Sequence, residues 1–304
     1  MKLEWLEDLL AVIEHGSLSK AAIARHLTQP AFSRRVRAIE NYLDCELFDR
    51  NRKPLQLTQS VREQEVTIRD CVSRLRELSD NLQQDARAQP LLTMACQHSI
   101  STAVAPAMIT RLADTVEARI RLRSANRDEC LTMVLTGQAG MAVVYRLNEE
   151  SLSASQFIET VSVGQDELIP VMSPDSLARY KREKRKGELS VVAYPEDVYL
   201  GKVFRQKILP DLAQRYQVHW NAETGLTTAA AEFARAGAGV AWVPESLVAT
   251  QLNDRSLLVA DRHLPRVLLN ICLLNLSQST SAEMVAIKAW LIENQLPLSQ
   301  LPLS

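Results

Sequence analysis

The N-terminal part of the chain repeats apolar residues with the period of an α-helix. A first apolar stripe consists of Trp5, Leu6, Leu9, Leu10 and Ile13. Gly16 follows this stripe, and glycine commonly ends a helix because it adopts the left-handed conformation without strain. Ser17 or Ser19 can then cap a second helix that runs to Leu27. The pattern therefore predicts two short helices joined by a tight turn.

A third helix begins at Gln29–Pro30, with Thr28 as its cap. Proline is tolerated at this point because the amides of a first helical turn need no helical partner. The apolar face of the third helix consists of Phe32, Val36 and Ile39, and the opposite face carries Gln29, Ser33, Arg34 and Arg37. Short helices, a tight turn and a basic polar face are typical of a helix-turn-helix, in which one helix enters the major groove of DNA.

A β-hairpin wing is predicted directly after these helices, within residues 47–58. Leu55 and Leu57 alternate beside a polar turn, as they would in a half-buried strand. The tip of this wing would carry Arg50, Arg52 and Lys53, which can reach a neighbouring minor groove. The alternative interpretation is an ordinary three-helix bundle with a solvated basic face.

Residues 59–88 contain no Gly or Pro, which predicts one long helix. Apolar residues form a coiled-coil-like seam along it: Val61, Ile68, Val72, Leu75 and Leu82. This seam can pack either on a second copy of the helix or on the second domain of the same chain. Gln89–Pro90 ends the helix and marks a domain boundary.

From Leu91 onward, strand and helix patterns alternate. The expected strands are 92–96, 119–123, 141–145, 168–172, 189–194, 218–222, 240–243 and 267–276. The expected helices are 105–113, 129–136, 203–215, 227–236 and 281–294. A repeated β-α-β-α-β order implies mostly parallel sheets covered by helices. Two such units in tandem indicate a hinged α/β binding domain with two lobes.

Ligands of such sheets bind outside the C-terminal ends of the strands, where the lobes meet. Polar side chains follow several of the predicted strands, and free amides at a helix start favour a polar or anionic ligand. The candidate effector-binding residues are Gln97, His98, Ser99, Ile100, Ser101, Asn126, Tyr145, Tyr194, Tyr199 and Thr224.

Charge is distributed unevenly along the chain. Across 304 residues, 35 Lys and Arg face 36 Asp and Glu, which gives a formal net charge of −1. Residues 17–39 nevertheless contain no acid, and their bases are Lys20, Arg25, Arg34, Arg35 and Arg37. The near-zero net charge of the whole chain therefore conceals one basic face that can contact DNA phosphates.

Composition bounds the remaining possibilities. The apolar content of 46% excludes wholesale disorder, and no apolar run is long enough to predict a membrane span. Five cysteines without a CxxC pair indicate a reducing cytoplasm, and acids within residues 1–10 argue against a secretory signal. Scattered histidines and the lack of a nucleophile elbow lead us to expect no metal, no cofactor and no enzymatic activity.

A family resemblance rests on residues of the N-terminal part: Ser17, Ala21, Ala22, Leu27, Gln29, Pro30, Ser33, Ile39, Glu40, Leu47, Phe48, Arg50, Leu57 and Thr58. The segment that they define resembles the DNA-binding part of LysR-type transcriptional regulators. Residues 237–245 are similar to the Gly-x-Gly-apolar-Pro signature in the second lobe of that family. Leu18 and Asp44 depart from the pattern, since the family usually has an aromatic residue and a turn glycine there.

The resemblance implies a role for each basic or polar position of the predicted helix-turn-helix and its wing. Base edges would be contacted by Gln29, Pro30, Ser33 and Arg34, because Gln pairs well with adenine and Arg with guanine. Phosphates would be contacted by Arg35, Arg37, Arg50, Arg52 and Lys53. The resemblance also implies a homodimer or homotetramer on double-stranded DNA, joined through the long helix in antiparallel fashion.

We therefore expect a winged helix-turn-helix at 1–58, a linker and dimerisation helix at 59–89, and an effector-binding domain at 90–304. The effector-binding domain would resemble periplasmic binding proteins, with one lobe at 90–163 and 267–304 and the other at 164–266. Within the family, residues 28–35, 96–101, 199–204 and 239–245 look similar to hypochlorite-responsive regulators, although positions such as Leu200 cannot be oxidised. The expected function is DNA-binding transcriptional regulation modulated by a small effector.

Two other classes of protein share part of this pattern. An α/β solute-binding protein or enzyme with a helical N-terminal appendage would bind a small molecule but no DNA. A purely structural DNA-bending protein would not need a large two-lobed half. The acid-free basic window at 17–39 argues against the first class, and the size of the C-terminal half argues against the second.

Overall fold

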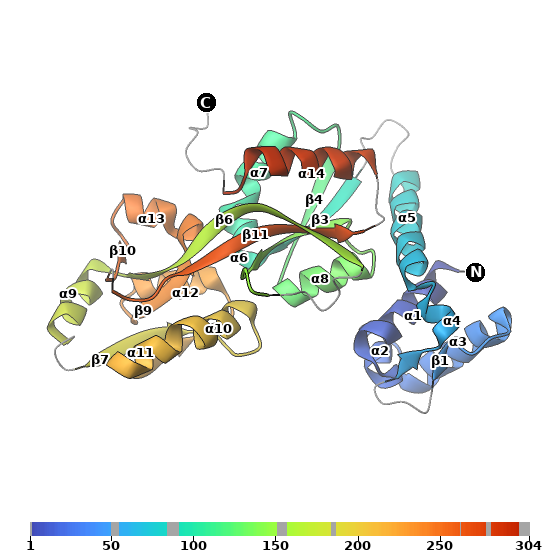
Figure 1. Cartoon of the computed structure of the whole chain (residues 1–304), viewed down its shortest axis with the longest axis horizontal. Coiled ribbons are helices and arrows are strands. Elements are labelled where there is room, and N and C mark those ends of the chain that lie inside the picture. Colours follow the sequence, from blue (N-terminus) through green and yellow to red (C-terminus); the bar gives the residue numbers. More distant parts are fainter. Residues whose placement is uncertain are drawn as a thin grey trace.

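A computed structural model describes residues 2–49, 55–83, 91–150, 157–183, 187–261, 263–277 and 281–297. Figure 1 shows a small N-terminal domain at one end, a helix rising from it, and two α/β lobes beyond. None of the described helices is long and apolar enough to cross a membrane. Within the described residues, no group of His, Cys, Asp and Glu side chains is arranged to hold a metal ion.

The N-terminal domain consists of α1 (Leu3–His15), α2 (Leu18–Ala24), α3 (Gln29–Leu43), β1 (Phe48–Asp49) and β2 (Gln56–Leu57). Its core forms where Phe32, Val36 and Ile39 meet apolar residues of α1 and α2. Two predicted helix boundaries are confirmed, with Gly16 in the left-handed conformation after α1 and Pro30 in the first turn of α3. The second helix ends at Ala24 and not at Leu27, and Ser17 and Thr28 precede their helices without a side-chain cap bond among the described residues.

Asp44 supplies the turn for which the family usually has glycine. It adopts φ +51° after α3, and its amide donates to the Glu40 carbonyl. Aspartate is one of the few residues that tolerate the left-handed region. The departure at this position therefore leaves the end of α3 intact.

The linker is built from two helices, α4 (Gln59–Arg62) and α5 (Glu65–Gln83), so the expectation of one unbroken helix is wrong. The Gln64 amide donates to the Val61 carbonyl three residues back, which tightens the chain between the helices. α4 can then cover the N-terminal core through Val61 while α5 leads toward the second domain.

The described strands of the C-terminal part form one nine-stranded sheet. In spatial order these are β4 (Arg119–Ala125), β3 (Leu91–Gln97), β5 (Met141–Arg146), β11 (Val267–Leu276), β6 (Ile158–Met172), β9 (Val240–Pro244), β7 (Glu188–Ala193) and β8 (Gln217–Glu223), with β10 (Leu258–Val259) beside β6. β3 pairs in parallel with β4 and β5, and β7 with β8 and β9, so each lobe has a parallel sheet. The long strands β6 and β11 pair antiparallel and join the lobes.

Helices cover both lobes. The first lobe has α6 (His98–Ala103), α7 (Ala105–Leu112), α8 (Arg127–Leu135) and α14 (Ala282–Asn294). The second has α9 (Pro174–Glu183), α10 (Tyr199–Val203), η2 (Phe204–Ile208), α11 (Leu209–Arg215), α12 (Thr227–Arg235), η3 (Glu245–Val248) and α13 (Ala249–Asn253). The predicted α/β class with two lobes is confirmed.

The expected helix at 203–215 is interrupted by the π-helical segment η2. Pro210 lies in the first turn of α11, directly after this segment. Proline has no amide hydrogen and clashes with the preceding turn, so the chain widens locally instead of continuing as a regular helix.

Candidate DNA-binding and effector-binding sites

The outer face of α3 presents most of the predicted base-contacting residues to solvent. Gln29, Pro30 and Arg34 are exposed, and Ser33 is half-buried beside them. The Gln29 side-chain amide donates to the Ser33 hydroxyl at 3.1 Å, which orders both groups at the start of α3. Arg37 is exposed one turn further along. The structure thus brings four predicted base contacts and one predicted phosphate contact together on one helix.

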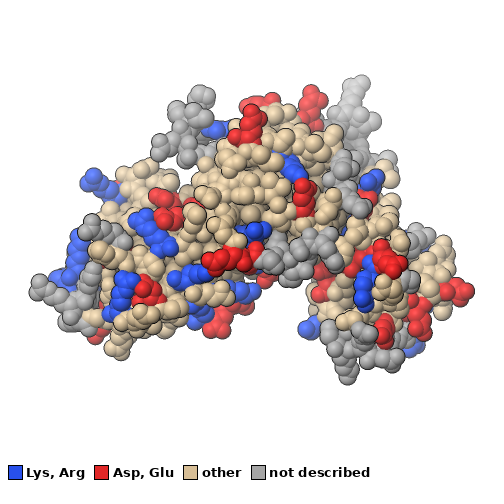
Figure 2. Space-filling view, in the orientation of Figure 1, with Lys and Arg blue, Asp and Glu red and all other residues tan. Residues whose placement is uncertain are grey.

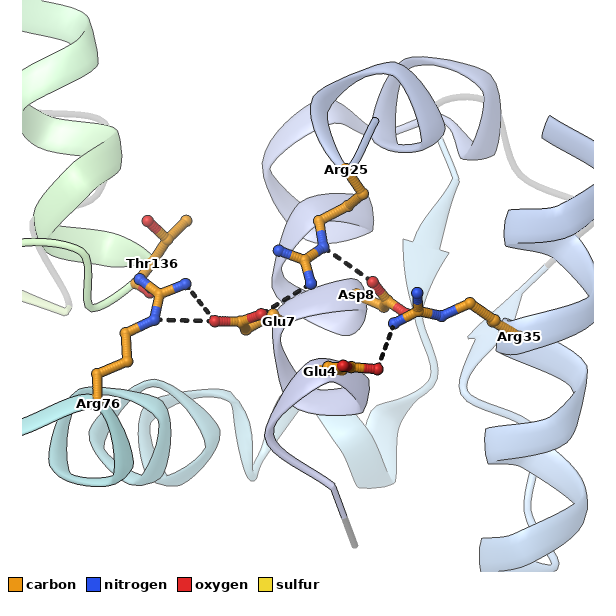
Figure 3. A network of polar contacts seen from close by, with 7 residues as sticks. All are labelled: Glu4, Glu7, Asp8, Arg25, Arg35, Arg76 and Thr136. Atoms are coloured by element: carbon orange, nitrogen blue, oxygen red, sulfur yellow. Dashed lines mark hydrogen bonds and ion pairs between the residues drawn. The ribbon is translucent and has the colours of Figure 1, made fainter. Parts of the chain in front are cut away.

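Arg35 turns away from this face toward α1. Its guanidinium pairs with Asp8 at 2.8 Å and Glu4 at 3.4 Å, and the Asp8 side chain is fully buried. Arg25, at the end of α2, approaches the same carboxylate at 2.9 Å (Figure 3). A predicted phosphate contact by Arg35 would compete with this pairing, so the geometry favours a role in holding the three helices together.

The wing forms as an antiparallel pair of strands. Phe48 lies opposite Leu57, and both side chains are buried in the N-terminal core. The predicted tip residues Arg50, Arg52 and Lys53 lie outside the described residues. The structure therefore supports the hairpin strands beside α3, while the role of the tip residues stays a prediction.

A second group of basic residues lies on α9, where Arg179, Lys181 and Arg182 are exposed. Figure 2 shows bases over the second lobe interspersed with acids. This mixture favours a solvated helix end over a second nucleic-acid site.

A small pocket lies between the lobes at the C-terminal ends of β3 and β4. It is lined by Gln97, His98, Ser99, Asn126, Arg127, Val198, Tyr199, Leu200, Gly225 and Thr227. The cavity measures about 20 Å³, little more than one water molecule occupies, so a larger ligand requires the lobes to separate. A wider hollow of about 840 Å³ lies elsewhere on the hinge, beside Asp166 and Ser246.

Half of the predicted effector-binding residues line this pocket: Gln97, His98, Ser99, Asn126 and Tyr199. The Ser99 hydroxyl is buried and forms no hydrogen bond within the described part of the chain. His98 shares a hydrogen bond of 2.9 Å between Nδ1 and the Ser124 hydroxyl.

Four of the other five predicted residues serve packing or backbone contacts. Ile100 is buried in the core, and the Ser101 hydroxyl donates to the Cys96 and Gln97 carbonyls. Tyr194 donates to the Trp242 carbonyl at 2.8 Å inside the second lobe, and Thr224 Oγ1 accepts from the Leu226 amide. The sequence places these residues near strand ends but does not reveal that their polar groups are already satisfied.

Tyr145 belongs to a polar cluster at the hinge, beside the wider hollow that Asp166 and Ser246 line. Its hydroxyl donates to Asp166 at 2.7 Å, and Asp166 also accepts from the Ser246 hydroxyl and amide. Burial and the Asp166 carboxylate raise the pKa of Tyr145 well above its usual range, so the phenol remains a donor. The cluster connects the strand β5 of the first lobe to the second lobe.

Sequence reasoning missed Arg127, which forms the main contact across the pocket. Its guanidinium makes two bonds to Glu150, at 2.7 and 2.8 Å, and lies 3.8 Å from the centre of the Tyr199 ring. The Tyr199 hydroxyl donates to Glu150 and accepts from the Leu147 amide. Although burial opposes ionisation, Arg127 lowers the pKa of Glu150 and keeps the pair charged. The only sequence signal was that this charged residue directly follows Asn126, a predicted effector-binding residue.

Comparison with known proteins decides the family. Residues 3–61 match the description "Bacterial regulatory helix-turn-helix protein, lysR family", and residues 85–295 match "LysR substrate binding domain". The chain belongs to the LysR family. These two matches cover the helix-turn-helix with its wing and most of the two-lobed domain.

Known transcriptional regulators resemble the chain over most of its length. The transcriptional regulator YjiE of Escherichia coli K12 is 25% identical over 263 residues, which cover 85% of this chain and 84% of YjiE. The fold also matches Vibrio fischeri DarR, solved with DNA, at a TM-score of 0.57 with 21% identity, covering 96% of this chain and 98% of DarR. Full-length Salmonella typhimurium HypT matches at 0.59 with 20% identity, covering 97% and 98%.

The family membership establishes the function class. This LysR-family protein is a DNA-binding transcriptional regulator with an effector-binding domain, and regulators of this family form oligomers. The family and the relatives are regulators and not enzymes. The solute-binding or enzymatic alternative has no support in these comparisons.

Proposed function

We propose that this regulator reads DNA bases with Gln29, Pro30, Ser33 and Arg34 and follows phosphates with Arg37. The exposure of this face at the start of α3, beside a β-hairpin, is the observation that carries the proposal. Arg50, Arg52 and Lys53 would extend the phosphate contacts from the wing. Side-chain amide and guanidinium groups match adenine and guanine edges in the major groove.

We propose further that a polar or anionic effector binds between the lobes, against Ser99, Asn126 and Arg127. The buried Ser99 hydroxyl and the Arg127 guanidinium supply donors for such a ligand. Because the cavity is small, binding would change how far the lobes are closed. The corresponding division of the chain is 1–58, 59–89 and 90–304, with lobes at 90–163 plus 267–304 and at 164–266.

The dimer that the family resemblance implies would form through α5. Leu75 and Leu78 on this helix are 41% and 53% exposed, which leaves apolar surface for a second copy. The two helix-turn-helix domains of the dimer would then bind two half-sites of one operator. Such a regulator acts where the chromosome lies, so we place it in the cytoplasm.

The narrower relation to hypochlorite-responsive regulators is also a proposal. Support comes from similar sequence stretches and from the shared fold with HypT, which is described as hypochlorite-specific. Burial raises the pKa of Cys130 to about 12 and that of Cys96 further, so neither thiol is a reactive thiolate at neutral pH. Reversible binding of a chlorine or sulfur anion is therefore favoured over oxidation of these two cysteines.

A titration of full-length protein with two DNA duplexes tests the DNA-binding proposal. One duplex carries the region upstream of the protein's own gene, and the other has the same base composition in scrambled order. We expect tighter binding of the genomic duplex by about 1,000-fold or more at physiological salt. Equal affinities would contradict base reading.

Thermal-shift measurements with chloride, hypochlorite and sulfite test the effector proposal, and an unchanged melting temperature with all three would contradict the proposed anion class.

A further inference from the structure

Two arginines of the linker helix connect three parts of the molecule. Arg69 and Arg76 are seven residues apart on α5 and therefore share one face, about 10 Å apart along the axis. Glu7 and Glu14 have the same spacing on α1 and face them. The result is a ladder with two rungs, Arg69–Glu14 and Arg76–Glu7, between the linker and the DNA-binding domain.

Each rung continues into the effector-binding domain. Arg69 Nη1 donates to the Leu135 carbonyl, and Arg76 Nη1 donates to the Thr136 carbonyl at 3.1 Å. These carbonyls lie at the C-terminal end of α8, where the helix dipole favours cations. Figure 3 shows Arg76 extending between Glu7 on one side and Thr136 on the other.

One rung of the ladder is buried and the other is half-buried. Arg69 is only 2% exposed, and it also pairs with Glu65 on its own helix at 2.7 Å. The Arg76 and Glu7 side chains are 24% and 14% exposed. Val72 lies between the rungs in sequence and is fully buried against Leu6 and Leu10 of α1. Charge pairs with this degree of burial hold their geometry better than surface pairs.

The other end of α8 lies at the pocket between the lobes. Asn126 caps the helix and Arg127 begins it, so the residue that grips Glu150 and Tyr199 is part of α8 itself. Asp128, the next residue, pairs with Lys202 of the second lobe at 3.4 Å. A helix of nine residues, about 13 Å long, thus has one end at the lobe interface and the other on the ladder.

We propose that α8 transmits the position of the second lobe to the DNA-binding domain, with Arg69 and Arg76 as the residues that couple α8 to α1. The inference rests on the proposed function, since it assumes that the pocket and α3 are the two working sites. When the second lobe moves, Arg127 moves the start of α8. The end of α8 then shifts the two arginines, and α1 moves with them. α1 in turn holds α3 through Asp8 and Arg35.

A double-mutant cycle on the full-length protein tests the coupling without knowledge of the effector. Arg127→Gln loosens the lobe end of α8, and Arg76→Gln removes one rung. The matched control is Arg74→Gln, because Arg74 lies on the same helix, is 66% exposed and pairs only locally with Asp70 among the described residues. Tyr199→Phe provides a second, milder change at the lobe end if Arg127→Gln does not fold. Circular dichroism and sedimentation check the fold and the oligomeric state of every variant.

The first readout is affinity for the duplex from upstream of the protein's own gene. We expect Arg127→Gln to change the Kd at least about fivefold in the wild-type and Arg74→Gln backgrounds, and less than about twofold with Arg76→Gln. An unchanged Kd in the wild-type background, or an equal change in all three, would overturn the proposal.

The second readout needs no DNA, so it separates the coupling from the proposed function. Hydrogen–deuterium exchange of α1 and α5 should rise on Arg127→Gln, and this rise should disappear in the Arg76→Gln background. If the wild type fails to discriminate between DNA duplexes, the proposed function fails while exchange still decides the coupling. If Arg127→Gln leaves hydrogen–deuterium exchange in α1 and α5 unchanged, the proposed coupling is overturned.

Discussion

Gly137 lies so close to Ser73 that a side chain has no room between them. A Cβ at Gly137 would fall 2.9 Å from the Ser73 backbone nitrogen and 3.0 Å from its Cα. Gly137 follows α8, and Ser73 lies between the two ladder arginines on α5. The backbone of the linker helix is therefore in direct contact with the turn that ends α8.

We predict that Gly137→Ala separates these two elements. The residue has φ +67°, which costs alanine about 1 kcal/mol, and the clash adds about 1–3 kcal/mol. Gly187→Ala is the matched control, because Gly187 has φ +72° but its nearest neighbour would be 3.9 Å away. Urea denaturation should show a larger loss for Gly137→Ala. Equal losses would mean that the contact with Ser73 contributes nothing.

Glu7→Gln should lower stability by about 1–2 kcal/mol at pH 7, because it removes the charge between Arg76 and Arg25. Burial alone raises the pKa of Glu7, but Arg76 and Arg25 lower it below the ordinary 4.5. A lowered pKa gives stability that is complete above pH 4.5 and is lost as the pH falls through the folded-state value.

Denaturation of the wild type and Glu7→Gln between pH 7 and about pH 3 measures this dependence. The difference between them should shrink as the pH falls. Glu4→Gln is the control, since Glu4 is 69% exposed and its pair with Arg35 should contribute little. A difference that stays constant down to the lowest pH would show that the Glu7 charge is not the cause.

Tyr199→Phe should loosen the lobe interface while keeping the ring under Arg127. The variant removes a donor to Glu150 and the acceptor of the Leu147 amide, at a cost of about 1–2 kcal/mol. Tyr194→Phe breaks a similarly buried bond to Trp242 inside the second lobe and serves as control. Hydrogen exchange around Leu147 and in α10 should rise only for Tyr199→Phe. A rise in both variants would indicate general destabilisation.

Arg35→Gln should affect the N-terminal fold more than DNA specificity. Its loss leaves Asp8, which is fully buried, with Arg25 as the remaining partner among the described residues. We expect a lower melting temperature and an unchanged ratio of specific to non-specific DNA affinity. A reduced ratio with unchanged melting temperature would assign Arg35 to the base-reading surface.

Local signals in the sequence predicted much of the fold. Gly16 and Pro30 mark a helix end and a helix start through backbone constraints that no tertiary contact needs to supply. The break after α4 has no such marker, because it depends on α4 covering one domain while α5 leads to another. Pro210 was visible, but the apolar period of residues 203–215 concealed its effect.

The candidate sites were predictable only in part. Exposure of Gln29 and Arg34 follows from helical periodicity, whereas the turn of Arg35 toward Asp8 depends on how α1 packs. Strand ends indicated Ser99 and Asn126 but also Tyr194, whose hydroxyl is bound inside its lobe. Arg127 and the ladder arginines form contacts with residues far away in the sequence, which local patterns do not encode.

The most direct test of base reading combines Arg34→Gln with substitutions in the bound DNA. Each guanine of the genomic site is replaced in turn, and the Kd of wild type and variant is measured at fixed salt. The wild type should lose about 10- to 100-fold in affinity at one guanine per half-site, and Arg34→Gln should be insensitive to that same base. Equal sensitivity of both proteins at every guanine would contradict the claim that the exposed face of α3 reads sequence through Arg34.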